Sequence, residues 1–421
     1  MDFGYAALDI TPPAGLELSG YGYFLRRRAL EVLDPLMARA VAFHDDLRCA
    51  VLVQLDLLAL DTKFVAAVRR AAARSYGLRP EAVMLHCTHT HSAPAVRRLF
   101  GCGEISPMFL RRLRVQIVAV IGQALATLAP AGRTARFEGA RFDGFAFNRA
   151  GGAPPDAEIR GVSVSFADAK PLVLLSYACH PVTLGPNRAY SADYCGAVLR
   201  ACAARDLRAV FLNGCSGDVA PRLQGIAPDA LIGVGSAFAD AVEAGLSKAT
   251  PWTPQRLRIG TRTVQLDADA DADADTDADA DAADYASRPS PPDPSDPPLA
   301  RVARACDAHL QALARAGRLD TATAVEVQTF GLGDVVVTAL GAEVFEALGA
   351  QLRAAFPAHL LLLASTSNGV AGYLTTAEDL AAEGYASTRG RRIYGLPRLR
   401  PESGERFVAA ATASIAEVLW T

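Results

Sequence analysis

Residues 83–94, with the sequence VMLHCTHTHSAP, lead from an apolar run directly into a pair of histidines. The first part of this stretch reads as a short buried strand, and residues 50–60 (AVLVQLDLLAL) read as the buried strand before it. Residues 62–76, between the two runs, have the spacing of an amphipathic helix. Strands that alternate with helices are typical of an α/β protein, so this stretch indicates the fold class.

The same alternation continues along the chain. We expect further helices at about residues 108–128, 194–205, 231–248 and 300–316, after Glu343 and at the C-terminus. We expect further strands at about residues 136–142, 161–166, 171–178, 209–212, 324–330, 334–340 and 359–364. Polar residues stand at the ends of these strands, where α/β proteins place their sites: His89, His91, His180, Asp218, Glu343 and Tyr373. The sequence therefore predicts one large mixed α/β domain over residues 1–421, with a site at strand ends.

Composition narrows the functional classes. The net charge is −3 and the pI is near 6.2, which gives no field to attract nucleic acid or an anionic membrane. The N-terminus lacks the pattern of a signal peptide, and no run approaches the ~18 apolar residues that cross a bilayer. The eight cysteines form no CxxC pair, which favours reduced, buried side chains. We expect a cytoplasmic protein with a small-molecule partner; the oligomeric state stays open.

Residues 267–297 depart from this pattern. They alternate Asp with Ala or Thr and then become rich in Pro, Ser and Asp. Such a segment cannot bury apolar surface, so we expect a disordered or exposed insertion within the domain. A calcium site is the alternative, but the glycines and fixed spacing of organised calcium loops are missing.

The histidine pair is the first chemical signal. If His89 and His91 lie in an extended strand, their side chains point to the same face. Such a pair can give a metal two nitrogen ligands, or one ligand and one acid–base group. The alternative interpretation is a pair of polar residues satisfied within a loop.

Short motifs along most of the chain carry a resemblance to a known family. They occur in this order: ALDITPP (7–13), THTHSAP (88–94), NR (148–149), CHP (179–181), SADY (191–194), GDV (217–219), GAE (341–343) and GYLTTAED (372–379). Tyr385 follows Tyr373 by twelve residues. In these motifs and their order the chain resembles the catalytic domain of the neutral, non-lysosomal ceramidases.

The resemblance implies a zinc site and a set of residues around it. It implies that zinc is bound by His89, His180, Glu343 and Tyr373, a ligand set that suits the metal. By the same resemblance, His91 transfers a proton, and Arg149 and Tyr385 bind polar groups of the substrate. Asp218 either orients a ligand or water or only shapes a turn.

One departure from the family concerns the nucleophile. Ceramide-cleaving members carry a nucleophilic serine at the position of Ala220, and a methyl group cannot attack a carbonyl. Ser216 and Cys215 are the nearest substitutes, at a different point of the loop. Attack by metal-activated water is the simpler mechanism.

The missing serine and one further departure from the family determine which substrate and reaction class we expect. The chain ends at residue 421, and we expect no C-terminal immunoglobulin-like domain. We therefore expect a zinc-dependent amidohydrolase acting on a small soluble amide rather than on ceramide. The alternatives are a non-hydrolytic biosynthetic enzyme that catalyses cyclisation or acyl transfer, and an inactive ligand-binding homologue.

Overall fold

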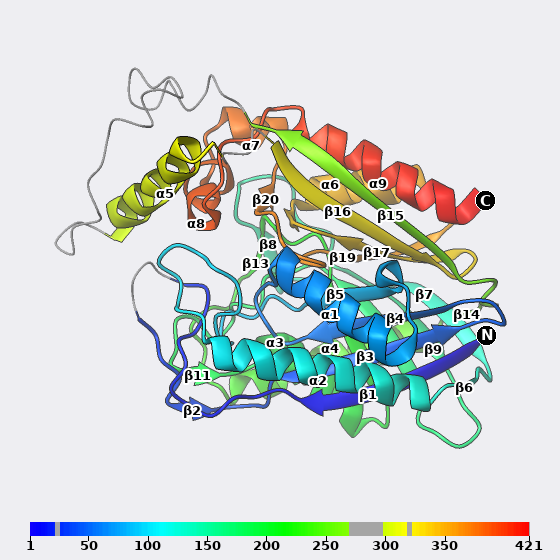
Figure 1. Ribbon diagram of the computed structural model, residues 1–421. Helices are drawn as coiled ribbons and strands as arrows, with labels where there is room; N and C mark the ends of the chain where they lie inside the picture. Colours follow the sequence, from blue (N-terminus) through cyan, green and yellow to red (C-terminus); the bar gives the residue numbers. More distant parts are fainter. Residues whose placement is uncertain (22–25, 269–297, 318–321, 421) are drawn as a thin grey trace.

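Three β-sheets and their helices make up the computed structural model, which describes residues 1–21, 26–268, 298–317 and 322–420. Each sheet carries helices on its outer face, while the inner faces of all three meet in one apolar core (Figure 1). The described chain is a single mixed α/β domain, which confirms the predicted fold class.

The first sheet has the strand order β5-β4-β3-β1-β6. Its strands are β1 (Asp2–Asp9), β3 (Met37–His44), β4 (Cys49–Leu55), β5 (Val83–Cys87) and β6 (Ala129–Pro130). Only β4 and β5 are parallel within this sheet. Helices α1 (Thr62–Tyr76) and α2 (Pro107–Ala126) cover its outer face and lie in front of it in Figure 1. Asp61 caps α1 by accepting a bond from the amide of Lys63, and Gly77 ends the helix at φ 69°.

The second sheet has the order β12-β10-β9-β7-β14. Its strands are β7 (Thr134–Arg141), β9 (Glu158–Val164), β10 (Leu172–Tyr177), β12 (Arg208–Asn213) and β14 (Thr250–Pro251). β10 and β12 are parallel. Helices α3 (Asp193–Ala204) and α4 (Ala230–Ser247) pack on its outer face.

Helix α4 is long and apolar enough to cross a membrane, by length and composition alone. Its Leu231, Phe238 and Val242 side chains pack into the core beneath the second sheet, whereas Ile232 is exposed. This packing accounts for the apolar composition of the helix. The absence of a membrane partner stays a prediction.

The third sheet has the order β15-β16-β17-β19, and β17 and β19 are parallel. Its strands are β15 (Arg258–Asp267), β16 (Ala322–Gly331), β17 (Val335–Leu340) and β19 (Leu360–Ala364). Helices α6 (Glu346–Ala355) and α9 (Ser403–Trp420) cover it, and α9 runs along β15 and β16 in Figure 1. The remaining helical segments are η1 (Pro80–Ala82), α5 (Pro298–Arg315), α7 (Ala377–Ala381), η2 (Ala386–Gly390) and α8 (Arg391–Tyr394). The short ribbons pair β2 (Glu31–Val32) with β11 (Ala189–Tyr190), β8 (Ala146–Asn148) with β13 (Val219–Pro221), and β18 (Glu343–Val344) with β20 (Tyr373–Leu374).

Successive side chains of the central strands point to opposite faces of the sheet, into two different hydrophobic cores. In β10, Leu172 and Leu174 face the core shared by the sheets, whereas Val173 and Leu175 pack against α3 and α4. Burying each such side chain stabilises the fold by about 1.5–3 kcal/mol. Strands buried on both faces are apolar throughout, which explains why these runs lack a polar alternation.

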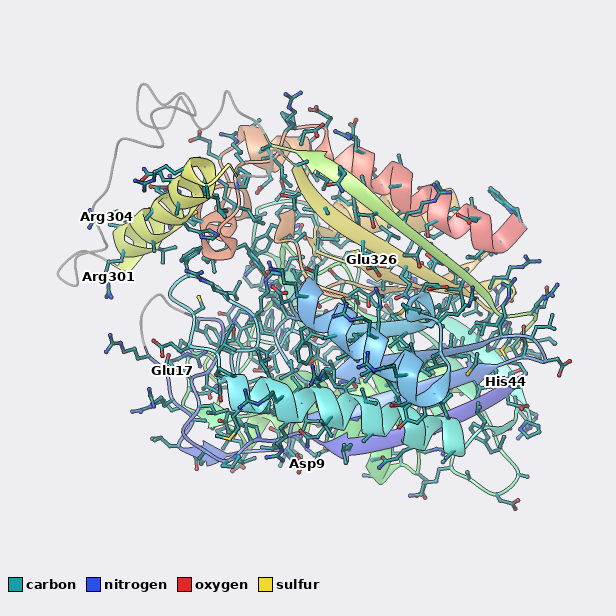
Figure 2. The ribbon with its side chains drawn as sticks, viewed as in Figure 1. Asp9, Glu17, His44, Arg301, Arg304 and Glu326 are labelled. Carbon is teal, nitrogen blue, oxygen red and sulfur yellow. The ribbon has the colours of Figure 1, made fainter. Side chains whose placement is uncertain are left out.

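Arg69 links the first sheet's helices to the third sheet. It lies on α1 and donates two hydrogen bonds to Glu326 of β16, at 2.9 and 2.7 Å. Figure 2 labels Glu326 between these two elements. The paired geometry is the strong form of an arginine–carboxylate contact.

His86 joins the three sheets where their parallel strands end. Its Nε2 accepts a bond from the amide of Asn213 at 3.0 Å, and its Nδ1 lies 3.1 Å from the hydroxyl of Ser367. Burial lowers the pKa of His86 to about 3, so the ring is neutral near pH 7. A neutral imidazole has one donor and one acceptor, and these two partners use both. The carboxyl ends of β5, β12 and β19 are thereby held together.

Some expected boundaries are corrected by the structure. The strand expected over residues 50–60 ends at Leu55, and residues 269–297 of the predicted insertion lie outside the described residues. Asp267, expected within that insertion, pairs with Ala322 in the β15–β16 ladder instead. The eight cysteines all fall within the described ranges, none of them forms a disulfide, and all but Cys49 are buried.

Candidate metal centre

His89 lies beyond the end of β5, which corrects the expectation of an extended strand here. The strand stops at Cys87, and His89 has a φ of 75°, a conformation that costs energy for a residue with a side chain. Its Nδ1 lies 2.8 Å from the carbonyl oxygen of Leu58. Because Nδ1–H donates there, the unprotonated Nε2 is the atom that faces the site.

His180 is oriented in the same way from the second sheet. Its Nδ1 lies 2.6 Å from the carbonyl oxygen of Ser216 and 3.2 Å from that of Val219. Burial, reinforced by Arg149, lowers the pKa of His180 to about 4, so the ring is neutral near pH 7. Its Nε2 therefore also presents a lone pair.

Glu343 brings a carboxylate oxygen to both rings. Its Oε2 lies 3.3 Å from Nε2 of His89 and 3.1 Å from Nε2 of His180, and the three residues are almost completely buried. Acceptor atoms that converge in a buried site could hold a metal cation, and Arg149 already brings a positive charge within 3.2 Å of Nε2 of His180. Ligands placed ~2.1 Å from a tetrahedral zinc are separated by about 3.4 Å, so the observed spacing fits the metal.

Tyr373 enters the site beside Glu343. The parallel pair β18–β20 places Tyr373 directly opposite Glu343 in register. Its hydroxyl oxygen accepts a bond from Arg149 at 3.1 Å. Burial and then Glu343 raise the pKa of Tyr373, whereas Arg149 lowers it. A bound cation would favour the phenolate and so offset the effect of burial.

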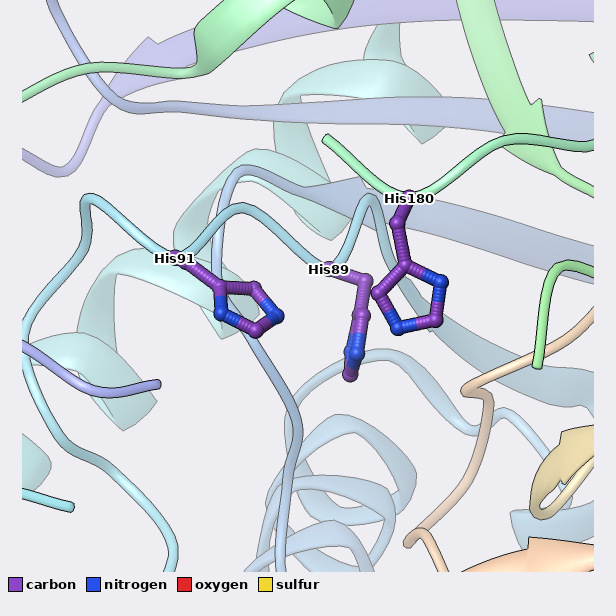
Figure 3. Close-up of side chains that lie close together, drawn as sticks. All are labelled: His89, His91 and His180. Atoms are coloured by element: carbon purple, nitrogen blue, oxygen red, sulfur yellow. The ribbon is translucent and has the colours of Figure 1, made fainter. Parts of the chain in front are cut away.

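His91 completes the histidine cluster of Figure 3, but its hydrogen bonding differs from that of the other two. The ligand atoms of His89, His91 and His180 lie within 4.8 Å of one another. The main-chain amide of Tyr21 donates to Nδ1 of His91 at 3.3 Å, and the Tyr21 ring packs edge-on against the imidazole. In a neutral ring the hydrogen then sits on Nε2, which is buried and has no partner among the described residues. His91 thus presents a donor where the other two histidines present acceptors.

Arg149 and Tyr385 stand at the open side of the site. One Nη of Arg149 contacts the carbonyl oxygen of Gly217 at 2.7 Å and Nε2 of His180 at 3.2 Å. The guanidinium lies 5.8 Å from the centre of the Tyr385 ring, which is 43% exposed. The structure therefore brings both residues to the cluster, as the resemblance implies.

These residues surround a cavity of about 340 Å³. Its lining includes His89, His91, Arg149, Glu343, Tyr373, Tyr385 and Tyr394, together with the apolar residues Leu58, Leu99, Phe147, Val182, Ala220 and Ile393. Cys215 and Ser216 are not part of this lining. The sulfur of Cys215 is packed against Gly349 of α6, and burial raises the pKa of its thiol to about 12. Neither substitute for the missing serine therefore faces the cavity.

Asp218 makes contacts that hold the scaffold. One of its oxygens accepts from the amide of Glu346 at the start of α6 (2.7 Å), and the other accepts from the side chain of Asn148 (2.8 Å). It lines a second cavity, of about 800 Å³, which shares Arg149 and Tyr385 with the first. Whether Asp218 also orients a ligand or water stays a prediction.

Sequence reasoning missed Tyr394, Tyr21 and Gly20. Tyr394 lies on α8 and donates from its hydroxyl to Oε1 of Glu343. Gly20, at φ 71°, packs so closely on His91 that an added Cβ would lie 2.3 Å from Nδ1. These contacts join segments far apart in the chain, and no local pattern marks them.

No protein-family model matches the sequence, and no curated protein matches it. Among solved structures, the chain is similar to neutral ceramidase from Pseudomonas aeruginosa, with a TM-score of 0.74 and 19% identity, covering 99% of this chain and 75% of that one. It is also similar to a ceramidase complexed with C2, with a TM-score of 0.75, 20% identity and the same coverage. At these identities the likeness concerns the fold: the chain is built on the neutral ceramidase fold, as the order of its motifs predicts.

Proposed function

We propose that this protein is a zinc-dependent hydrolase that cleaves the C–N bond of a small soluble amide. The observation that carries the proposal is the convergence of three buried acceptor atoms, Nε2 of His89, Nε2 of His180 and Oε2 of Glu343. Tyr373, whose oxygen already accepts from Arg149, is the fourth zinc ligand in this proposal. The shared fold supports the amide-cleaving class.

Zinc held by these residues would polarise a substrate carbonyl and lower the pKa of a water molecule. Arg149 and Tyr385 line the cavity beside Tyr373. In this proposal they donate hydrogen bonds to the carbonyl oxygen as it gains negative charge.

His91 is the proton-transfer residue in this mechanism. Its Nε2–H is aimed at the cavity and has no partner among the described residues. In this neutral ring the proton would pass to the departing nitrogen only as the ring takes up the proton released by the attacking water, so one proton moves from water to amine and the ring ends unchanged. The water oxygen joins the carbonyl carbon, and the products are a carboxylic acid and an amine.

Water is the nucleophile in this proposal. Cys102 lines the cavity, but burial raises the pKa of its thiol to about 11, so it is not a thiolate near pH 7. Ala220 occupies the wall where the resemblance places a serine, and Cys215 and Ser216 lie outside the lining. The cavity of about 340 Å³ falls within the usual range for small-molecule sites. We infer a small soluble substrate, a cytoplasmic location for the protein, and no nucleic-acid or membrane partner.

The test is hydrolysis by the zinc-loaded protein in isotope-labelled water, with a panel of small N-acyl amides. Hydrolysis puts one solvent oxygen into the carboxylate product, and removing zinc with a chelator should abolish turnover. A product without solvent oxygen would instead indicate cyclisation or acyl transfer by the same residues. Zinc binding without any turnover across the panel would favour an inactive ligand-binding protein.

A further inference from the structure

The two carboxylate oxygens of Glu343 have different partners. Oε2 faces Nε2 of His89 and of His180, whereas Oε1 accepts a hydrogen bond from the hydroxyl of Tyr394. Glu343 is 3% exposed and Tyr394 is 9% exposed, so water competes little for this bond. The terminal torsion of a glutamate is soft, and a fixed partner on one oxygen is what gives the other a fixed direction.

Tyr394 is itself held from several sides. It ends the short helix α8, which closes at Gly395 with φ 69°. The guanidinium of Arg97 lies over the Tyr394 ring, 5.0 Å from its centre. The amide of Phe100 donates to the carbonyl oxygen of Ile393 at 2.7 Å, which fixes α8 against the segment after the histidine motif.

Tyr373 and Tyr394 differ in their other contacts, although their rings stand only 6.1 Å apart and both hydroxyls interact with Glu343. The hydroxyl oxygen of Tyr373 accepts a bond from Arg149, a cation that favours a phenolate. The hydroxyl of Tyr394 uses its hydrogen on Glu343 and must keep that hydrogen to do so. Tyr373 is therefore suited to bind a metal, and Tyr394 is suited to orient a ligand.

We propose that Tyr394 is a positioning residue that holds the Glu343 carboxylate with Oε2 turned towards the metal site. This rests on the proposed zinc site. Removing the hydroxyl frees Oε1, so the carboxylate would lose the partner that fixes its direction and could rotate. Partners of this kind typically contribute 10–100-fold to metal affinity, so Tyr394→Phe should weaken zinc binding by about that factor.

The experiment compares Tyr394→Phe and Tyr373→Phe with wild type as metal-free proteins. Tyr177→Phe is the control, because Tyr177 is also buried and its hydroxyl contacts the carbonyl oxygen of Phe142, in the second sheet's core. Zinc affinity is measured by competition with a chromophoric chelator, and cobalt(II) and copper(II) are then added as spectroscopic probes. Circular dichroism and thermal unfolding check that each variant is folded.

The expected results separate the two tyrosines. Tyr394→Phe should bind zinc about 10–100-fold more weakly, change the cobalt spectrum, and keep the phenolate-to-copper absorption band. Tyr373→Phe should lose that band, and Tyr177→Phe should behave as wild type. If wild type binds zinc and Tyr394→Phe shows unchanged affinity and cobalt spectrum, the role of Tyr394 is wrong and the zinc site stands. If wild type binds no zinc, the proposed function fails and this inference fails with it.

Discussion

Gly20 is the position at which one added methyl group tests the role of His91. A Cβ at Gly20 would lie 2.3 Å from Nδ1 of His91, 2.6 Å from its Cγ and 2.9 Å from Cδ1 of Leu58. Ordinary contact begins at 3.4 Å, so the imidazole must retreat by about 1.1 Å. The φ of 71° adds about 1–2 kcal/mol of backbone strain in Gly20→Ala.

The consequence for catalysis follows from the size of this displacement. A misplacement of about 1 Å typically costs about 100-fold in rate, and we expect kcat/KM of Gly20→Ala to fall by about that factor. The free energy of unfolding should fall by about 1–3 kcal/mol, through backbone strain and repacking. Zinc affinity should stay close to that of wild type, because His91 presents a hydrogen rather than a lone pair.

The assay uses Gly15→Ala as the matched control. Gly15 also has a positive φ, of 109°, but an added Cβ there meets no atom within 4 Å. Both variants are compared in zinc affinity, amide hydrolysis, unfolding, and the nitrogen NMR shifts of His91, which distinguish its two tautomers. A loss of zinc affinity in Gly20→Ala as large as that in His89→Ala would make His91 a ligand and refute this reasoning. Unchanged hydrolysis would refute its place in proton transfer.

Three further predictions concern the scaffold, the nucleophile and the carboxylate ligand. His86→Leu should lower the free energy of unfolding by about 2–5 kcal/mol near pH 7 in denaturant titrations, because the amide of Asn213 loses its buried acceptor. The folded-state pKa of His86, about 3, lies below its unfolded value of 6.5. As the pH falls, His86 therefore takes up a proton in the unfolded chain but not in the folded protein, so wild type loses stability. The difference in free energy of unfolding between wild type and His86→Leu should shrink by about 2 kcal/mol between pH 6.5 and 4.5. Wild type should show no burst of covalent acyl-enzyme in mass spectrometry if water is the nucleophile; Ala220→Ser, which puts a hydroxyl where the resemblance places a serine, is the comparison variant. Glu343→Gln should lose both zinc binding and turnover. Glu346→Gln is the control and should keep both, because Glu346 does not line the cavity that Glu343 lines.

The parts of the fold that local patterns determine were predictable from the sequence. Helix α1 begins and ends where the spacing of residues 62–76 predicts, because its cap residues and apolar face lie within that stretch. Strand β3 was not expected, because it is defined by its pairing with β1 and β4 rather than by a pattern of its own. The three-sheet arrangement depends in the same way on contacts between distant segments.

The site was predictable in its members but not in its geometry. His89, His180 and Glu343 stood out because polar residues followed apolar runs, and the resemblance added Tyr373. The left-handed backbone of His89 could not be anticipated, because it is set by the Leu58 carbonyl that binds its ring. The role of Tyr394 also depends on a contact across 51 residues of chain, which no local pattern reveals.

The metal content of the purified protein, measured beside its His89→Ala and Tyr373→Phe variants, decides whether these residues form a zinc site. We expect about one zinc per chain in wild type, none in His89→Ala, and weakened binding in Tyr373→Phe. A wild-type protein that holds no metal and takes up none when zinc is added would contradict the account, because the converging acceptor atoms would then serve only the scaffold.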